Sequence, residues 1–362
     1  MITYEEHRLR SLVDEGRWID LLGAYRQARA AAVALDLANG GPVDGDPADG
    51  DLTGSDLTGS DPADRRRTVA TAIAASAAQS RAGIATAALG HLIAFAAPPE
   101  VAARLFDADG GPGTAAGVAD HDAGPLWEVL ATRHTWRRLA PLLGPPPVRR
   151  LVAQTRVLLG EDLSRGAEPD PEGVPLLLEP WESVGRAEGM PVREYLRQGG
   201  SRSALLTLPA SREGLARVEL PEPGVRLPGQ PATRALAELA GWARTVCVRG
   251  PAAGAAAQLA PGPLVTGGYL PFALAWPALV QAGIADRAHG AAHGRLALWR
   301  VLTAMTGVQR PESADRAEVR ALVARMRCFT WDDPADRLRH LHLALEDPAT
   351  GLSWAVSGSE EV

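Results

Sequence analysis

The sequence contains no lysine. All 37 of its Lys/Arg positions are arginine in a chain of 362 residues, and Asn39 is its sole asparagine. The absence of lysine excludes the P-loop lysine of nucleotide-binding proteins, the strand lysine of protein kinases and a Schiff base with pyridoxal phosphate. Arginine stays protonated and pairs with carboxylates or phosphates, so it does not serve as a general base. Because Ala, Arg, Gly and Pro are abundant, the bias also reflects the codon usage of a GC-rich genome.

Cysteine and excess charge are scarce as well. Cys247 and Cys328 form neither a C-x-x-C motif nor a disulfide framework, which indicates a reducing cytoplasm. The net charge of −6 argues against nucleic acid as a partner. The N-terminus lacks the basic start and apolar run of a secretory signal. The apolar stretch 269–285 is interrupted by Pro271 and Pro277, so we predict a buried core helix there and no membrane span.

Helical periodicity dominates what the sequence does contain. We predict a mainly α protein of antiparallel helix pairs, an irregular helical array with a small β-containing middle segment. Residues 1–160 are expected to be helical with a disordered acidic loop at 41–64, because that loop is too polar to bury a core. Residues 161–230 read as a Pro/Gly-rich segment with short strands, and residues 231–362 as a helical region that ends in a short strand.

Apolar spacing places individual elements within these regions. The predicted helices cover 4–13, 18–37, 68–97, 125–143, 148–159, 232–246, 271–285, 288–305, 314–327 and 335–345. The predicted strands cover 174–178, 204–208, 215–220 and 351–356.

A group of arginines is the first candidate site. The segment 129–160 contains no acidic residue, and a helical wheel of residues 148–159 shows an apolar stripe with arginines outside it. One interpretation is an anion-binding or partner-binding patch that recognises phosphate, nucleic acid or an acidic protein surface. The alternative is a solvated helix face whose arginines pair with nearby acids. The candidate residues are Arg137, Arg138, Arg149 and Arg150.

The polar face of the helix predicted at 288–305 is the second candidate. Helical spacing puts a carboxylate, two imidazoles and a guanidinium on one side, a set that could hold a ligand or a divalent metal. An ordinary surface helix shows the same pattern. A cluster of these side chains around one pocket would favour a binding site, and four solvated side chains would favour ordinary surface. The residues are Asp286, His289, His293 and Arg300.

Other motifs give no assignment. His340 and His342 fall on opposite faces of the helix predicted at 335–345, so they cannot share a metal ion unless that segment is a strand. Neither an H-E-x-x-H motif nor a complete G-x-S-x-G elbow is present. We therefore assign no catalytic residue and no metal ligand, and we expect no cofactor.

Two C-terminal segments resemble an uncharacterised family of actinobacterial proteins. They are Gly290-Ala-Ala-His-Gly-Arg-Leu-Ala-Leu-Trp299 and Asp347-Pro-Ala-Thr-Gly-Leu-Ser-Trp-Ala355. The similarity covers roughly the last third of the chain and consists largely of small, common residues. It implies an actinobacterial, cytoplasmic origin and carries no activity.

These observations predict a non-catalytic cytoplasmic interaction protein of the scaffold, regulatory or immunity type. Its expected partner is another protein, because helix pairs prevail, enzyme motifs are missing and the 9 tryptophans are residues that often anchor interfaces. The alternative is an enzyme, or a small-molecule or metal binder, that uses the polar face from Asp286 to Arg300. The sequence favours neither nucleic acid nor a membrane as partner and leaves the oligomeric state open.

Overall fold

The structure is a computed structural model that divides into two compact units, residues 1–105 and 106–362. The acidic loop predicted at 41–64, and the candidate residues Asp286 and His289, lie outside the described residues. The described residues are 11–38, 89–106, 125–144, 146–182, 207–284, 290–307, 315–336 and 338–360.

Helices make up the described part of the first unit. The helix predicted at 18–37 is confirmed as α2 (Trp18–Ala38), which buries Leu21, Leu22 and Tyr25. Residues 89–96 are helical, and α4 (Pro99–Ala102) and the short 3-10 helix η1 (Ala103–Phe106) follow them.

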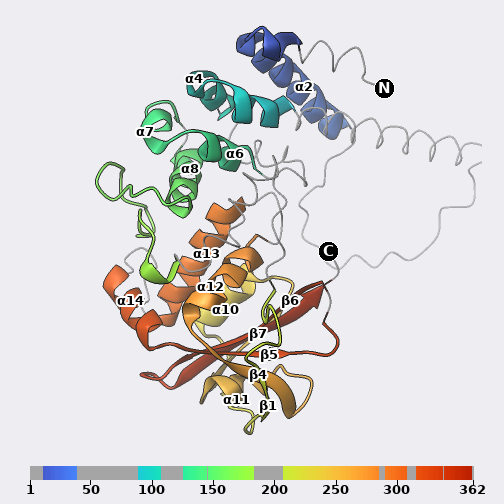
Figure 1. The fold of residues 1–362 in the computed structure, drawn as a ribbon, viewed down its shortest axis with the longest axis vertical. Helices are drawn as coiled ribbons and strands as arrows, with labels where there is room; N and C mark the ends of the chain where they lie inside the picture. The colour runs from blue at the N-terminus through green and yellow to red at the C-terminus, as the bar shows by residue number, and fades with distance from the viewer. Residues whose placement is uncertain are drawn as a thin grey trace, which may run out of the picture. The chain divides into compact units, whose positions relative to one another are not determined.

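A seven-stranded antiparallel sheet forms the base of the second unit (Figure 1), so the prediction of a mainly α fold was wrong. The strand order is β1-β4-β5-β6-β7-β3-β2, with the β6–β7 hairpin near the centre. The strands are β1 (Ala216–Glu219), β2 (Val225–Arg226), β3 (Arg244–Arg249), β4 (Leu264–Leu270), β5 (Arg327–Asp332), β6 (Arg339–Asp347) and β7 (Leu352–Glu360).

The helix predictions failed where a helical wheel was applied to a segment in which leucines alternate with other residues. The helix predicted at 335–345 was wrong, because most of that segment belongs to β6, and the helix predicted at 232–246 ends before β3. In β6 the leucines at 341, 343 and 345 alternate with His342 and Ala344, and side chains two residues apart share one face of a strand. His340 and His342 therefore lie on the same face, with ring centroids 5.9 Å apart.

The other strand predictions had mixed outcomes. The segment 215–220 contains β1, and the segment 351–356 begins β7, as predicted. Residues 174–178 form no strand. Within 204–208, Leu208 forms a parallel bridge with Leu341.

Helices cover both faces of the sheet (Figure 1). On one face, α10 (Pro231–Leu239) contacts β3 and β7, while α12 (Phe272–Ala282) contacts β5 and β6. The long helix α13 (Gly290–Met305) packs on α10 and α12. On the other face, the short α11 (Ala252–Ala256) closes an apolar core that includes Trp331.

Five further helices of the second unit lie before or after α13 in the chain. They are α6 (Leu126–Arg133), α7 (Trp136–Leu139), α8 (Pro146–Leu158), the 3-10 helix η2 (Pro180–Glu182) and α14 (Arg316–Arg325). The apolar stripe predicted for residues 148–159 is confirmed, because Val148, Leu151, Val152, Thr155 and Leu158 of α8 are buried. Both α8 and α14 contact α13.

Close packing of α12 and α13 depends on glycine. A Cβ at Gly294 would lie 2.1 Å from the carbonyl oxygen of Val280, a distance that real atoms do not tolerate.

Among the described residues, no helix has both the length and the apolar character needed to cross a membrane. The predicted core helix at 271–285 is α12, which spans 11 residues and has Trp276 fully buried.

Candidate ligand-binding pocket

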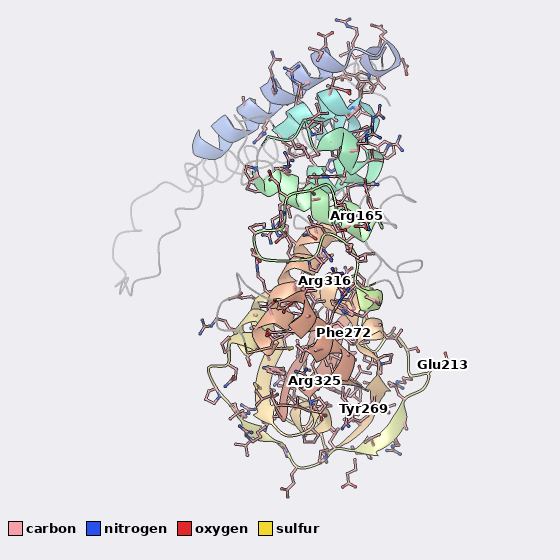
Figure 2. All side chains as sticks on the ribbon, turned by 90° about the vertical axis from the view of Figure 1, so that its left-hand side faces the viewer. Arg165, Glu213, Tyr269, Phe272, Arg316 and Arg325 are labelled. Carbon is pink, nitrogen blue, oxygen red and sulfur yellow. The ribbon has the colours of Figure 1, made fainter. Side chains whose placement is uncertain are left out.

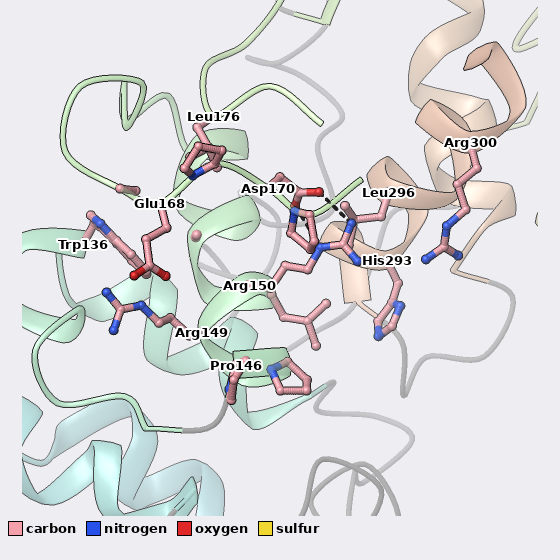
Figure 3. A pocket seen from close by; sticks show the side chains of 16 residues that line it. Trp136, Pro146, Arg149, Arg150, Glu168, Asp170, Leu176, His293, Leu296 and Arg300 are labelled. Carbon is pink, nitrogen blue, oxygen red and sulfur yellow. Dashed lines mark hydrogen bonds and ion pairs between the residues drawn. The ribbon is translucent and has the colours of Figure 1, made fainter. Parts of the chain in front are cut away.

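A cavity of about 540 Å³ lies between α7, α8, α13 and the segment that follows α8 (Figure 3). It brings together two residues of the arginine patch, Arg149 and Arg150, and two of the polar helix face, His293 and Arg300. The other two patch residues, Arg137 and Arg138, are exposed on α7 and do not line the cavity. The apolar part of its wall includes Trp136, Pro146, Pro147, Leu151, Leu176 and Leu296.

Two helices place these side chains by simple spacing. Residues three, four and seven apart share one side of a helix, so α13 presents His293, Leu296 and Arg300 along one line. The first turn of α8 contains Pro146 and Pro147, and its next residues bring both arginines to the cavity. Proline suits the first turn because its missing N–H needs no partner there.

Arg150 is fully engaged by acids. Its Nε and Nη2 donate to the two carboxylate oxygens of Asp170, each at 2.8 Å, and its Nη1 donates to Glu172 at 2.9 Å. The buried Gln154 also donates to Asp170, at 3.0 Å. A two-pronged arginine–carboxylate pair is among the stronger hydrogen-bonded contacts in proteins, so Arg150 joins α8 to the segment that follows it.

Arg300 is engaged in the same way. Its Nε and Nη2 donate to the carboxylate of Glu172 at 2.7 and 2.8 Å. Hydrogen bonds from Arg300, and further ones from Arg150, lower the pKa of Glu172 to about 2 although burial acts against this. One carboxylate thus links α8 to α13 across the cavity.

Arg149 differs from these two arginines. Its guanidinium carbon lies 5.6 Å from the centre of the Trp136 ring, a cation–π contact. Within the described part of the chain, no carboxylate forms a hydrogen bond or ion pair with Arg149. Figure 3 labels Arg149, Trp136 and Glu168 in the cavity wall, and Glu168 is an exposed residue of that wall. Of the three arginines that line the cavity, Arg149 is therefore the one whose guanidinium can pair with an anionic ligand.

His293 contributes a half-buried ring to the wall. It meets Trp127 edge-on, with ring centroids 6.1 Å apart. An imidazole can donate or accept a hydrogen bond, which suits the polar end of a ligand.

Behind the cavity lies a buried ion pair that sequence reasoning missed. Arg295 is fully buried, and it donates to both oxygens of Glu182 at 2.9 and 2.8 Å and to the carbonyl of Pro175 at 2.9 Å. Gln154 accepts a further bond from Arg295, and Trp299 Nε1 donates to Glu182 at 2.9 Å. These bonds anchor the segment 161–182 as a wall of the cavity.

The same segment is also fastened to α14. Glu179 is fully buried, and it accepts hydrogen bonds from Arg316 and Arg320. Figure 2 labels Arg316 at the start of α14 and Arg325 at its end. The composition of the sequence could have indicated these ion pairs. Acids at 170, 172, 179 and 182 follow the segment 129–160, which has arginines and no acids.

Comparison with known proteins adds no assignment, because no protein-family model, curated protein or solved structure matches this chain. The resemblance of residues 290–299 and 347–355 to an actinobacterial family therefore stays a prediction. The fold and cavity define the class of the molecule: an α+β protein with a preformed small pocket whose charged wall is held by arginine–carboxylate pairs.

Proposed function

We propose that this protein is a non-catalytic binding protein, and that its ligand is a small molecule with an apolar body and one carboxylate. The observation that carries the proposal is Arg149, whose guanidinium lies on Trp136 in a partly apolar cavity and has no carboxylate partner among the described residues. This adopts the small-molecule alternative for the polar helix face, since His293 and Arg300 line the same cavity.

The dimensions of the cavity support a small ligand. Binding sites for small molecules commonly enclose about 300–1,000 Å³ and combine apolar walls with a few polar groups. A volume of about 540 Å³ falls in that range. Proline rings and leucine side chains of α8, α13 and the segment 161–176 would contact the apolar body, and Arg149 would meet the charged end.

The charge balance favours a monoanion. Arg150 and Arg300 are already neutralised by Asp170 and Glu172. Glu168 also lines the cavity, and its charge would repel a dianion such as a phosphate monoester more strongly than a monoanion. A carboxylate matches the two-pronged geometry of one guanidinium and needs no further cation.

The cellular setting belongs to the same proposal. Cys247 and Cys328 are both free and buried, which supports a reducing compartment, the cytoplasm. A protein partner, expected from the sequence, remains a second proposal. The observation in its favour is that Arg137 and Arg138 are exposed on α7 away from the cavity lining.

Ligand-observed NMR with matched fragment pairs tests the pocket. Aryl and alkyl carboxylates are compared with their primary amides, which have the same body without the charge. We expect the carboxylate to bind at least roughly 10-fold more tightly than its amide, because a hydrogen bond to a charged group contributes about 1.5–3 kcal/mol.

Two arginine variants identify the site. Arg149→Gln should remove the preference for the carboxylate, while Arg137→Gln, which changes an exposed arginine of the same sequence patch, should leave it intact. Equal binding of acid and amide by the unmodified protein would contradict the proposal. So would an unchanged preference in Arg149→Gln.

A further inference from the structure

The turn between β5 and β6 gathers a second cluster, away from the residues that line the cavity. Asp333, Asp336 and His342 place three potential ligand atoms within 4.8 Å of one another. His342 is a buried residue of β6, whereas both aspartates belong to the turn. Carboxylate oxygen and imidazole nitrogen are ligands that zinc and other divalent first-row metals accept.

We infer that this cluster is a binding site for one divalent transition-metal ion of the zinc type. His342 carries the argument. Its Nε2 lies 2.6 Å from Asp336 Oδ1, and its Nδ1 lies 2.8 Å from Ser357 Oγ on the paired strand β7. When Nδ1–H donates to Ser357, Nε2 keeps a lone pair beside Asp336 Oδ1, and one cation can bind both atoms.

The contact with Ser357 is the kind of support that metal-binding histidines have. Such a histidine usually donates its other ring N–H to a fixed oxygen, which sets the tautomer and the orientation of the ring. Ser357 lies directly opposite His342 in the register of β6 and β7, and both residues are buried. Ring contact with Trp331, at 5.5 Å between centroids, further restricts His342.

The charges of the cluster also favour a cation as ligand. Elsewhere in the second unit, buried acids such as Glu179 and Glu182 are paired with arginines. Within the described ranges, the ion-pair partners of Asp336 are His340 and His342. Asp333 instead accepts a hydrogen bond from the backbone N–H of Ala335 at 2.9 Å.

His340 closes one side of the site. Its Nε2 lies 3.0 Å from the carbonyl oxygen of Pro209 and 3.9 Å from Asp336, so the nearer contact is with Pro209. Leu208 is hydrogen-bonded to the backbone of both histidines, at 3.1 and 2.8 Å. The ion would have three protein ligands, Asp333, Asp336 and His342, with water in the remaining position.

Ser357, His342 and Asp336 are also connected in the manner of a hydrolase relay. Ser357 lies within β7, and it is 5% exposed. A serine nucleophile needs an exposed oxygen, which hydrolases place on a sharp turn between a strand and a helix. This position favours support of His342 over nucleophilic attack.

Metal titration of the full chain without a histidine tag tests the inference. After treatment with a chelator, the protein is titrated with Co²⁺, and Zn²⁺ is then added as a competitor. We expect one equivalent of Co²⁺ to give the visible absorption of four- or five-coordinate cobalt, and zinc to remove it. Binding should also raise the melting temperature.

Isosteric variants locate the ion. Asp333→Asn and Asp336→Asn should each weaken Co²⁺ binding by more than about 10-fold, and Ser357→Ala by about 10-fold, the range for outer contacts of a metal site. Asp332→Asn is the matched control, because Asp332 is the adjacent carboxylate and pairs with Arg212 at 2.6 Å. It should bind as the unmodified protein does.

Three results would overturn the inference. They are binding below about a tenth of an equivalent, unchanged affinity in both Asp333→Asn and Asp336→Asn, and loss of binding in His293→Gln in place of the hairpin variants. The last result would move the metal to the cavity. Because Ser357→Ala removes a single hydroxyl, it keeps the test decisive if an aspartate variant does not fold.

Discussion

The helical side of the second unit pairs its buried carboxylates with arginine, whereas the β5–β6 hairpin pairs a half-buried carboxylate with histidine. On the helical side, Glu182 and Asp170 each meet an arginine in a two-pronged pair. At the hairpin, Asp336 meets the imidazoles of His340 and His342. Arginine keeps its charge at every physiological pH, whereas histidine can release a proton.

This difference suits the arginine pairs to structural support and the histidines to the binding of an exchangeable ligand. The arginine pairs fix the segment 161–182 against three helices and so give the cavity a rigid wall. Histidine offers a nitrogen lone pair once its proton is lost, so a metal ion can take the place of that proton. Among the arginines that line the cavity, Arg150 and Arg300 are held in such pairs, whereas Arg149 has no carboxylate partner among the described residues.

The largest effect is expected from breaking the buried arginine pair. Arg295→Met should lower the free energy of unfolding by about 3–5 kcal/mol, because it leaves Glu182 charged and buried without its partner. Adding Glu182→Gln to that variant should restore part of the loss. Denaturant unfolding measures both changes.

A surface arginine provides the control for that experiment. Arg327 is 65% exposed and lies 3.7 Å from Glu346, so Arg327→Met should cost less than about 1 kcal/mol. Equal losses in Arg295→Met and Arg327→Met would show that the buried network does not stabilise the fold.

Glu128 sharpens the comparison because it is a buried acid that accepts a hydrogen bond from a backbone amide. Burial raises its pKa to about 7, although the N–H of Ala291 donates to it at 3.1 Å and acts in the opposite direction. The folded state therefore binds the proton more tightly than the unfolded state does. Stability from this group is full below pH 4.5 and is lost as pH rises through about 7.

Glu128→Gln should flatten this pH dependence. At pH 8 the variant should be more stable than the unmodified protein by roughly 2–3 kcal/mol, because the neutral amide still accepts from Ala291 and no charge is buried. Denaturant unfolding at several pH values from 5 to 8 measures the difference. A parallel pH dependence in both proteins would show that Glu128 is not the group responsible.

The smallest effect is expected at the rim of the cavity. The pKa of Glu172 is lowered, so its contribution to stability is present above pH 4.5 and is lost as pH falls toward about 2. Arg300→Gln should raise that pKa and cost less than about 1 kcal/mol at neutral pH, since the Arg300 side chain is 51% exposed. An acid titration of the Glu172 carboxyl by NMR checks the direction.

The sequence was sufficient for elements whose pattern is local. α2, α8 and α12 follow from apolar spacing, and β7 follows from its own residues. The sheet was missed because its strands pair across long separations: β3 pairs with β7 about a hundred residues later, which no local window reveals. β6 alternates with a period of two, but its leucines also fit a helical wheel.

The sequence indicated several residues of the candidate site, but it did not show that they line a single cavity. Arg149 and Arg150 are far in sequence from His293 and Arg300, and only the packing of α8 on α13 brings them to one cavity. The alternative interpretation of the arginines, pairing with nearby acids, is what the structure shows for Arg150. Its partners lie in the Pro/Gly-rich segment, whose irregular path has no periodic signal.

The NMR spectrum of the arginine Nε–H groups tests the central claim most directly. The Nε–H groups of Arg150, Arg295 and Arg300 donate to carboxylates, so their protons should exchange slowly with water. That of Arg149 should exchange fast and, of these four signals, should shift most when an aryl carboxylate is added. A slowly exchanging Arg149 that ignores the carboxylate, or a shift confined to Arg150 and Arg300, would contradict the assignment of Arg149 as the ligand-facing cation.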